Sequence, residues 1–516
     1  MSTNREIAQR YLDLAKSKPG NDAVIYRRAP LAGCKLTYAD IANRSDDLMT
    51  QFRAAGLGVG ARCAVTLADT LDLVPALLAL WRLDATAVLV DPAWGGRLRS
   101  NITSHSGANF ALDLRAETKA SRIGPDEFSH QLPDGTALLG YTSGSTGDPK
   151  AIPFTHAKLA LTMQHSSLVC AALRGGASPK RIGYSARLSG SGVLNLNYMW
   201  APFADAAVVV LPELTVSTAR HYWGQIDEAG VEQTYLFPAH VEIVNQLALR
   251  SPLRVAPLCL TGSAPIPERL QRRFQERFGL PLLNCYGIME AMCIVFFGHV
   301  GGDCNATAAV GNSWFDPTLL HGLPHALQEK LASGTGGTVV EARLVDDQGA
   351  VVLGPGQGEL QLSGPTVMDY YYGNPAATAG AFDGHWFRTG DIARRDETGI
   401  YTIIGRRKHV VMKGGFSIYL TEVEEATMSI PGVIETVAVP LDLEGHEDIG
   451  LLVRLAGDCS LTATDIRTAI CDQLGAQRAP YRVVVTSKRL PRTGPEKLDR
   501  RAASQLWAAE VGGSMQ

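Results

Sequence analysis

The sequence lacks a long apolar run, a strong excess of charge and paired cysteines. Its nine cysteines are scattered without a C-x-x-C pair, so neither a disulfide framework nor a zinc site is indicated. No apolar run reaches the roughly 18 residues of a membrane span, and the N-terminal segment suits a surface helix better than a secretory signal. A net charge of −3, without a basic stripe, argues against nucleic-acid binding. These absences predict a cytoplasmic protein.

The spacing of short apolar segments predicts an α/β fold. Residues 62–67 and 85–90 have the pattern of buried strands, and residues 71–83 between them have that of a helix. Further strands are predicted at residues 206–211, 233–237, 255–261 and 281–285. The repeated order indicates a doubly wound α/β fold, with a large N-terminal domain of stacked sheets and helices that includes a β-rich subdomain. Binding sites are expected beyond the carboxyl ends of the strands.

The last third of the chain has two other patterns. Residues 352–415 are rich in glycine and contain alternating segments, which indicates antiparallel β-structure. A smaller α+β unit is predicted beyond residue 408. Its predicted elements are a helix near residues 422–428, strands at 436–440, 450–455 and 483–486, and a helix at 461–474.

A loop of glycines and small hydroxyl residues follows the apolar run at residues 137–139 and ends at Lys150. Its candidate ligand groups are Thr142, Ser143, Gly144, Ser145, Thr146 and Gly147. Exposed backbone N–H groups, hydroxyls and one ammonium group can together bind phosphate. Pro149 stands where a Walker loop needs glycine. Composition alone does not separate such a loop from an ordinary flexible one.

Four further segments complete a recognisable series: residues 284–290, 386–391, 405–408 and 490–497. In this order and spacing the chain resembles the adenylate-forming enzymes, which include acyl- and aryl-CoA synthetases, peptide-synthetase adenylation domains and beetle luciferases. The resemblance covers nearly the whole chain. It implies a large N-terminal domain (1–405), a hinge (406–409) that contains Lys408, and a small mobile C-terminal domain (410–516).

The resemblance also implies roles for individual residues. Tyr286 would stack on the purine, Glu290 would bind Mg²⁺, Asp391 would accept the ribose hydroxyls, Arg406 would be a second nucleotide-binding cation, and Lys497 would be the catalytic lysine. Further nucleotide contacts are expected from Gly262, Ser263, Ala264 and Gly287. Each residue type also has an ordinary structural explanation, such as a core tyrosine, a solvated glutamate or an exposed lysine.

The implied reaction has two halves. ATP and a carboxylic acid would give an acyl-adenylate and pyrophosphate, with Lys150, Glu290 and Lys497 as the catalytic residues. The small domain would then turn about Lys408, and a thiol would attack the adenylate. CoA is the first choice of acceptor, a carrier protein's phosphopantetheine is next, and an amine, which would make the protein an amide synthetase, is the alternative.

The acid is expected to be aromatic or bulky. Relatives that activate α-amino acids hold the amino group with an aspartate in the segment that matches residues 181–200, and no acidic residue occurs there. The order Tyr-Gly-x-x-Glu-Ala-Met looks most like benzoate-type aryl-CoA ligases. The predicted pocket residues are Ser189, Gly190, His240, Gly262, Gly287 and Met292. Met292 as core filling and His240 as a structural histidine are the alternatives.

Several positions depart from the pattern of the family. Met289 stands where most relatives have a threonine that contacts the α-phosphate, and Glu496 directly precedes the catalytic lysine. Ala151, His409 and Leu420 are further departures. They leave open a non-catalytic ATP-binding homologue, and a luciferase-like oxidase of the adenylate is another alternative.

Overall fold

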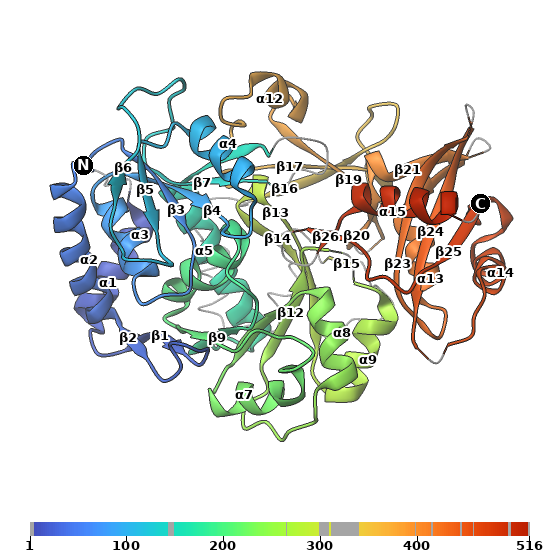
Figure 1. Ribbon diagram of the computed structural model, residues 1–516, viewed down its shortest axis with the longest axis horizontal. Coiled ribbons are helices and arrows are strands. Elements are labelled where there is room, and N and C mark those ends of the chain that lie inside the picture. The colour runs from blue at the N-terminus through green and yellow to red at the C-terminus, as the bar shows by residue number, and fades with distance from the viewer. Residues whose placement is uncertain are drawn as a thin grey trace.

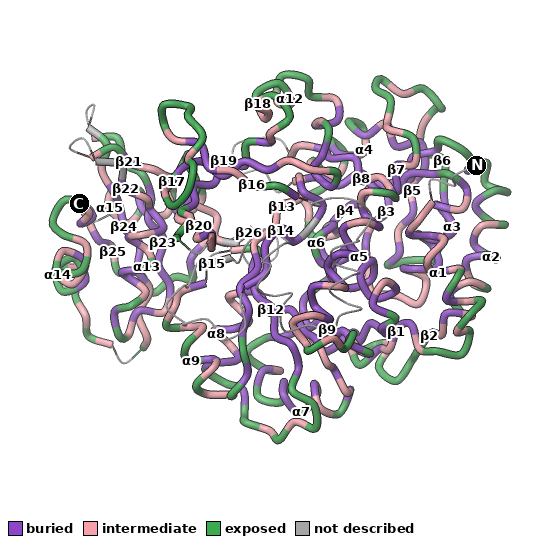
Figure 2. Tube along the Cα trace, turned by 180° about the vertical axis from the view of Figure 1, so that it is seen from behind, coloured by how far each residue is buried: buried purple, intermediate pink, exposed green. Residues whose placement is uncertain are grey.

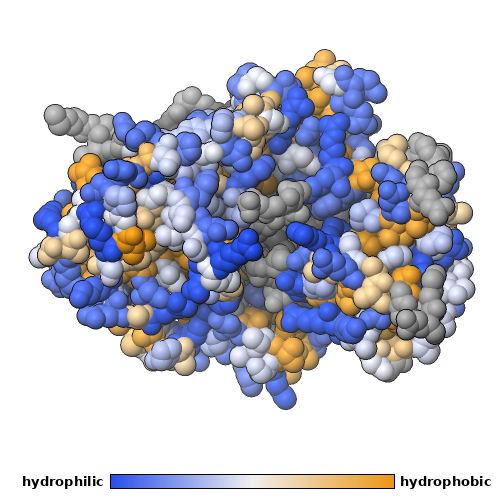
Figure 3. Space-filling view, turned by 45° about the horizontal axis from the view of Figure 1, so that its top comes forward, coloured by the Kyte–Doolittle hydropathy of each residue, from blue (hydrophilic) through white to orange (hydrophobic). Residues whose placement is uncertain are grey.

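The computed structural model shows a large N-terminal part and a smaller C-terminal part at one end of the molecule (Figure 1). The residues that it describes are 5–142, 149–264, 266–298, 309–310, 340–397, 399–413, 416–443, 446–457, 459–493 and 497–513. No helix within these ranges combines the length and apolarity that a bilayer crossing requires. On the face seen in Figure 3, hydrophobic residues are scattered among hydrophilic ones.

The first sheet has six strands in the order β6-β5-β3-β4-β7-β8. Its strands are β3 (Arg62–Thr66), β4 (Thr86–Val90), β5 (Phe110–Asp113), β6 (Ser121–Arg122), β7 (Thr136–Tyr141) and β8 (Ala151–Thr155). Strands β3 and β4 are parallel and flank helix α3 (Leu73–Arg82) in the chain, which confirms the predicted strand–helix–strand unit. Every residue of β4 and β7 is buried, as expected for parallel strands covered on both faces (Figure 2).

The second sheet has eight strands in the order β14-β13-β12-β11-β9-β10-β1-β2. Its strands are β1 (Asp22–Tyr26), β2 (Lys35–Thr37), β9 (Arg181–Tyr184), β10 (Ala207–Val210), β11 (Gln233–Leu236), β12 (Leu258–Gly262), β13 (Leu282–Ile288) and β14 (Cys293–Phe297). The four predicted strands are confirmed, but β12 begins at Leu258 and not at residue 255. Val255 is half exposed, so its hydrophobicity does not mark a core position.

Helices cover both sheets. They include α1 (Glu6–Ser17), α2 (Tyr38–Ala54), α4 (Gly96–Ser106), α5 (His156–Leu173), α7 (Tyr222–Glu228), α8 (Pro238–Leu247) and α9 (Glu268–Phe278). One continuous core contains buried residues of α1, α2, α3, α5 and both sheets. Strands β10 and β11, which follow β9 in the chain, lie on opposite sides of it. Such a reversal leaves a crevice at the carboxyl end of the strands, where α/β proteins bind ligands.

The third sheet is antiparallel and confirms the prediction for residues 352–415. It contains β15 (Ala309–Val310), β16 (Glu341–Val345), β17 (Gly356–Ser363), β18 (Phe382–Asp383), β19 (Trp386–Arg395) and β20 (Tyr401–Arg406). Helix α12 (Pro375–Ala381) precedes β18.

The C-terminal part is an α+β unit with its own core, as predicted. Its elements are β21 (Val410–Lys413), β22 (Phe416–Tyr419), α13 (Leu420–Met428), β23 (Val433–Leu443), β24 (His446–Leu455), α14 (Ala463–Leu474), β25 (Arg482–Val485), β26 (Arg492–Thr493), β27 (Lys497–Leu498) and α15 (Arg500–Gly513). Several hydrogen bonds connect it to the N-terminal part, among them one from Nε2 of Gln357 to the hydroxyl of Tyr419 at 3.0 Å. The guanidinium of Arg269 on α9 donates to the carbonyl of Val433 at 2.9 Å, and Thr421 on α13 donates to the carbonyl of Ile404 on β20.

A buried ionic cluster lies on β23. The carboxylate of Glu435 accepts hydrogen bonds from Nε of Arg454, at 2.5 Å, and from Nη2 of Arg492, at 2.7 Å. Burial by itself would raise the pKa of Glu435, but the two arginines outweigh it and lower that pKa below its usual range. Because the pKa of Glu435 is lower in the folded state than in the unfolded state, this carboxylate stabilises the fold at pH values above its unfolded-state pKa. The contribution is lost as the pH falls through the folded-state pKa.

We therefore expect Glu435→Gln to lower the free energy of unfolding of the C-terminal unit by about 2 kcal/mol at pH 7, because two charge-assisted hydrogen bonds are weakened. The difference in the free energy of unfolding between the variant and the unsubstituted protein should shrink as the pH falls below about 4.3, the usual pKa of glutamate. Hydrogen exchange of the β23 and β24 amides measures this difference. Glu510→Gln, which changes a half-buried glutamate that binds the exposed Lys488, is the matched control. A difference that stayed constant with pH would contradict this account.

Candidate active site

The predicted phosphate loop begins where β7 leaves the first sheet. The backbone N–H of Thr142 donates to the carbonyl of Lys150 at 2.9 Å, and the N–H of Lys150 donates to Oγ1 of Thr142 at 3.2 Å. These two bonds close the base of the loop. The predicted ligand groups Ser143, Gly144, Ser145, Thr146 and Gly147 lie outside the described residues, so their roles stay predictions.

Lys150 and Glu290 lie on either side of the Tyr371 side chain. The Lys150 ammonium is 4.5 Å from the centroid of the Tyr371 ring, and the Tyr371 hydroxyl donates to Oε1 of Glu290 at 2.8 Å. The structure thus brings together a cation and a carboxylate that are far apart in the sequence. No pattern in the sequence distinguishes Tyr371, because it stands between Tyr370 and Tyr372 and the three tyrosines share one spacing.

The donor set beside the loop fits a magnesium ion. No three His, Cys, Asp or Glu side chains gather as a ready-made metal site anywhere in the described ranges. Glu290 is therefore a single carboxylate close to a phosphate loop. Mg²⁺ commonly takes one or two protein carboxylates and completes its shell with phosphate oxygens and water.

A second polar group surrounds Asp391. This residue lies on β19 opposite Arg406 of β20, whose Nε is 2.7 Å from Oδ1 of Asp391. The hydroxyl of Tyr286, on β13, donates to Oδ2 at 2.6 Å. Three of the residues predicted for the nucleoside are thus in direct contact, although they come from two different sheets.

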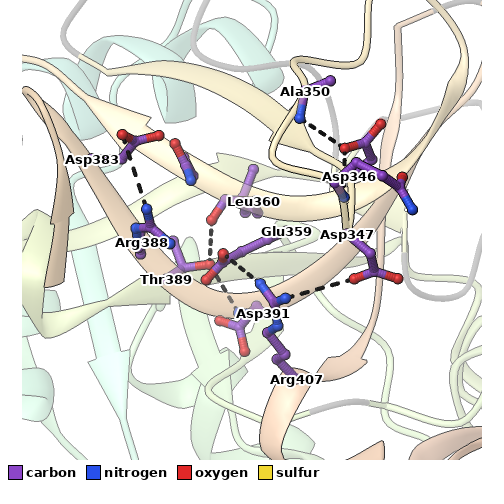
Figure 4. A network of polar contacts seen from close by, with 12 residues as sticks. Asp346, Asp347, Ala350, Glu359, Leu360, Asp383, Arg388, Thr389, Asp391 and Arg407 are labelled. Carbon is purple, nitrogen blue, oxygen red and sulfur yellow. Dashed lines mark hydrogen bonds and ion pairs between the residues drawn. The ribbon is translucent and has the colours of Figure 1, made fainter. Parts of the chain in front are cut away.

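Asp391 is also fixed by its own backbone. Figure 4 shows Thr389 on the same strand, with its hydroxyl donating to the carbonyl of Leu360 at 2.6 Å. The N–H of Asp391 donates in turn to Oγ1 of Thr389 at 3.0 Å. Burial raises the pKa of Asp391, and the opposing effects of Arg406 and the Tyr286 hydroxyl offset only part of this. Each carboxylate oxygen retains a second lone pair, so the group can still accept hydroxyl donors such as those of a ribose.

The two polar groups interact with each other. The negative charge of Glu290 contributes to the raised pKa of Asp391. Partial burial and the positive charges of Arg406 and Lys150 lower the pKa of Lys408, the predicted hinge residue, while Asp391 opposes this. Lysine and arginine side chains therefore gather around the two carboxylates. This arrangement suits an anionic ligand, because added negative charge would relieve the repulsion between the cations.

Tyr286 also has an aromatic neighbour. Its ring is 5.8 Å from that of Phe296, which stacks in turn on Tyr401 at 5.2 Å. The predicted contact between Tyr286 and a purine is not tested by this geometry.

The carboxyl end of β12 lies directly against β13. A Cβ atom on Gly262 would lie 2.2 Å from the carbonyl oxygen of Cys285 and 2.7 Å from the hydroxyl of Tyr235, so only glycine fits there. Ser263 follows with a φ of +70°, and its Oγ is 3.2 Å from the same tyrosine hydroxyl. Ala264 is half-buried. The close packing and the local backbone conformation thus account for the residue types at positions 262 and 263. The predicted contacts of Gly262 and Ser263 with a nucleotide stay predictions.

The predicted acid pocket involves the segment that follows β9. Ser189 is buried, and Gly190 begins α6 (Gly190–Leu194), which contacts β4 and β7. Met292 is buried with a φ of +66°, and its carbonyl accepts a 3.5 Å contact from Nδ2 of Asn195. The segment at 190–199 therefore lies against the turn between β13 and β14, near Gly287.

His240 is buried near the start of α8, with its ring 5.4 Å from that of Phe237. Burial lowers the pKa of His240 to about 4, so the imidazole is neutral at pH 7. Its Nδ1 has no hydrogen-bond partner among the described residues. A buried polar atom without a partner is unfavourable, and a ligand that reaches it would remove that cost.

The last positions to place are Lys497, Glu496 and Met289. The backbone of Lys497 lies in β27 and pairs with Thr493 of β26, while its side chain and Glu496 lie outside the described residues. The side chain of Met289 lies close to β7, since a Cβ atom on Gly140 of that strand would be 3.1 Å from Cε of Met289. The departure from threonine thus places an apolar side chain beside the strand that leads into the loop.

The chain is similar to known proteins in sequence and in structure. Residues 13–372 match the family described as AMP-binding enzyme. A feruloyl-CoA synthase from Amycolatopsis sp is 27% identical over 497 residues, which cover 90% of this chain and 93% of that protein. The solved anthranilate CoA ligase with bound anthranoyl-AMP is similar with a TM-score of 0.78 and 19% identity, covering 99% of this chain and 98% of that one.

A third similar protein is o-succinylbenzoate coenzyme A synthetase from Bacillus subtilis, solved with ATP and a magnesium ion. Its TM-score is 0.76 at 22% identity, and the match covers 95% of this chain and 98% of that one. The resemblance to adenylate-forming enzymes is therefore confirmed, and the chain belongs to the family of AMP-binding enzymes.

Proposed function

We propose that this enzyme is an ATP-dependent acid ligase that forms an acyl-adenylate, releases pyrophosphate and transfers the acyl group to CoA. The observation that carries the proposal is the convergence of two groups at one site. Lys150, Tyr371 and Glu290 lie at the phosphate loop, and the Asp391 carboxylate pairs with Arg406 nearby. The relatives named as CoA ligases, and the similar structures with ATP or an acyl-adenylate bound, support it.

In the first half-reaction a carboxylate oxygen attacks the α-phosphorus of ATP, the new O–P bond forms, and the bond to pyrophosphate breaks. Both reactants are anions, so the site must neutralise charge and align them. Lys150 and the loop would hold the departing phosphates, and Lys497 would bridge the reacting groups. Magnesium bound through Glu290 would supply further charge neutralisation.

In the second half-reaction a thiol attacks the acyl carbonyl and AMP leaves. We place the hinge for the change between the halves at residues 406–409, with domains at 1–405 and 410–516. We propose that three basic residues, Lys413, Arg478 and Arg407, face the nucleotide end of CoA, and all three have acidic partners in this arrangement. Lys413 binds Asp448 at 2.8 Å, Arg478 lies 3.3 Å from Glu422, and Arg407 binds Glu359 (Figure 4). Binding of CoA at these residues would have to compete with those ion pairs.

We infer an aromatic or bulky acid as the substrate. The segment after β9 has small residues at Ser189 and Gly190, and the neutral, buried His240 offers no charge to an amino group. The similar proteins named for feruloyl, anthranilate and o-succinylbenzoate act on aromatic acids. We propose a cytoplasmic location, because none of the cysteines whose side chains the structure describes forms a disulfide.

The substrate proposal predicts that pyrophosphate release with aryl acids exceeds that with α-amino acids by at least about tenfold, the factor that roughly 1.4 kcal/mol of differential binding provides. The measurement is pyrophosphate release over a panel of aryl, alkyl and amino acids. Product analysis with CoA, and then with an amine in the absence of thiol, identifies the acceptor. Faster turnover of amino acids, or amide formation without thioester, would contradict the proposal.

The two lysines are expected to act in different ways. Lys497→Ala should lower adenylation about a thousandfold, the effect of removing a group that stabilises the transition state, but should preserve CoA attack on a supplied acyl-adenylate. Lys150→Ala should lower adenylation only about tenfold, because backbone donors of the loop remain. Lys488→Ala, which changes an exposed lysine paired with Glu510, is the control. Equal loss of the second half-reaction in both variants would show that this division of roles is wrong.

The contact between Asp391 and Arg406 at the proposed nucleoside site predicts a defect in ATP binding when Asp391 is changed. Asp391→Asn removes the charge that faces Arg406 and should raise the KM for ATP about tenfold, the effect of weakening a charge-assisted hydrogen bond, with a smaller change in kcat. Steady-state kinetics with ATP varied at saturating acid measures this. Asp383→Asn, which changes a half-exposed aspartate of the same sheet bound to Arg343, should have the KM of the unsubstituted enzyme. A purely kcat effect in the Asp391 variant would contradict the assignment.

A further inference from the structure

The segment from Val367 to Tyr372 connects the two sides of the proposed phosphate site. The N–H of Met368 donates to the carbonyl of Glu290 at 2.7 Å. Four residues further on, the N–H of Tyr372 donates to the carbonyl of Ala151, directly after Lys150, at 2.9 Å, and the two residues form an isolated antiparallel bridge. One short segment thus binds the backbone next to both functional side chains. We call residues 367–372 the connecting segment.

Other contacts hold the connecting segment in place. The Lys158 ammonium, at the start of α5, donates to the carbonyl of Val367 at 2.6 Å and binds Asp369 at 2.9 Å. The N–H of Tyr371 donates to Oγ1 of Thr378 on α12 at 3.0 Å. The backbone of Tyr371 is therefore fixed from both sides, so its side chain is held in one place between Lys150 and Glu290.

Two separate parts of the Tyr371 side chain make two different contacts. Its hydroxyl donates to Oε1 of Glu290 at 2.8 Å, and its ring face lies 4.5 Å from the Lys150 ammonium. The residue is only 5% exposed. A hydrogen bond to one carboxylate oxygen sets the direction of the other oxygen. An ammonium over an aromatic face is attracted by the ring and held near it.

We propose that Tyr371 is a positioning residue, whose hydroxyl orients the Glu290 carboxylate for a divalent cation and whose ring holds Lys150 for the phosphates. This inference rests on the proposed function, which assigns Glu290 to magnesium and Lys150 to phosphate. It adds that one side chain prepares both groups before the nucleotide arrives. A tyrosine that merely filled the core would be replaceable by phenylalanine at this site, since the two rings have the same shape.

The test compares Tyr371→Phe, Tyr371→Leu and Tyr372→Phe. Calorimetric titration with α,β-methylene-ATP, which is not cleaved, gives the affinity of the full-length protein at several Mg²⁺ concentrations and in EDTA. Tyr372→Phe is the matched control. It removes a buried phenol hydroxyl from the same segment, but that hydroxyl contacts Arg62 and the carbonyl of His130 and not the site.

We expect Tyr371→Phe to require about tenfold more Mg²⁺ for half-maximal tightening of nucleotide binding, the usual cost of losing a group that orients a metal ligand. Its affinity in EDTA should equal that of the unsubstituted protein, because the ring still holds Lys150. Tyr371→Leu should have the same Mg²⁺ defect and, in addition, several-fold weaker binding in EDTA. Tyr372→Phe should bind with unchanged affinity in both conditions.

The inference would be overturned if Tyr371→Phe had an unchanged Mg²⁺ requirement, or if Tyr372→Phe showed the same shift. In either case, nucleotide binding by the unsubstituted protein would still support the proposed function. Failure of the unsubstituted protein to bind the analogue at all would overturn both. Circular dichroism and thermal unfolding of each variant separate a loss of folding from a loss of affinity. Glu290→Gln combined with Tyr371→Phe should show no additional Mg²⁺ defect, because the hydroxyl acts through that carboxylate.

Discussion

The buried carboxylate of Asp391 is the interaction on which the arrangement of the site depends. Asp391 lies on the antiparallel sheet and forms an ion pair with Arg406 of the neighbouring strand. It also accepts a hydrogen bond from the hydroxyl of Tyr286, which lies on the eight-stranded sheet. Removing a carboxylate from water is costly unless it is paired and hydrogen-bonded. The contact therefore holds the two sheets in a definite relation, and with them β13, which leads into Glu290.

The balance of charge around this carboxylate explains why an anionic nucleotide suits the site. Burial, together with the positive charges of Arg406 and Lys150, lowers the pKa of Lys408. Glu290 and Asp391 compensate part of this positive charge, and Tyr371 lies between Lys150 and Glu290. A polyphosphate would add the missing negative charge, and a divalent cation on Glu290 would prevent repulsion between that carboxylate and the phosphates. In the proposed function, binding of the two ligands would thus be electrostatically coupled.

Most of the fold could be predicted from the sequence, because buried parallel strands are apolar throughout. The runs that became β4, β7 and β10 stand out for this reason. Boundaries were less predictable. Val255 is apolar and was assigned to a strand, but it is exposed, and hydrophobicity alone does not distinguish it from the core residues that follow. The glycine at 262 was expected as a ligand contact, and its close approach to Cys285 depends on the pairing of β12 with β13.

The sequence by itself determined the family and the α/β class, and it predicted residues for phosphate, ribose and cation binding, because these inferences depend on local motifs in a fixed order. Only the tertiary structure decided which groups meet. Tyr371 has no local signal, and its function arises because the connecting segment pairs with Ala151 at one end and with Glu290 at the other. The contact of Tyr286 with Asp391 likewise joins two sheets that are distant in the chain. Such contacts depend on long-range packing, which local sequence patterns do not encode.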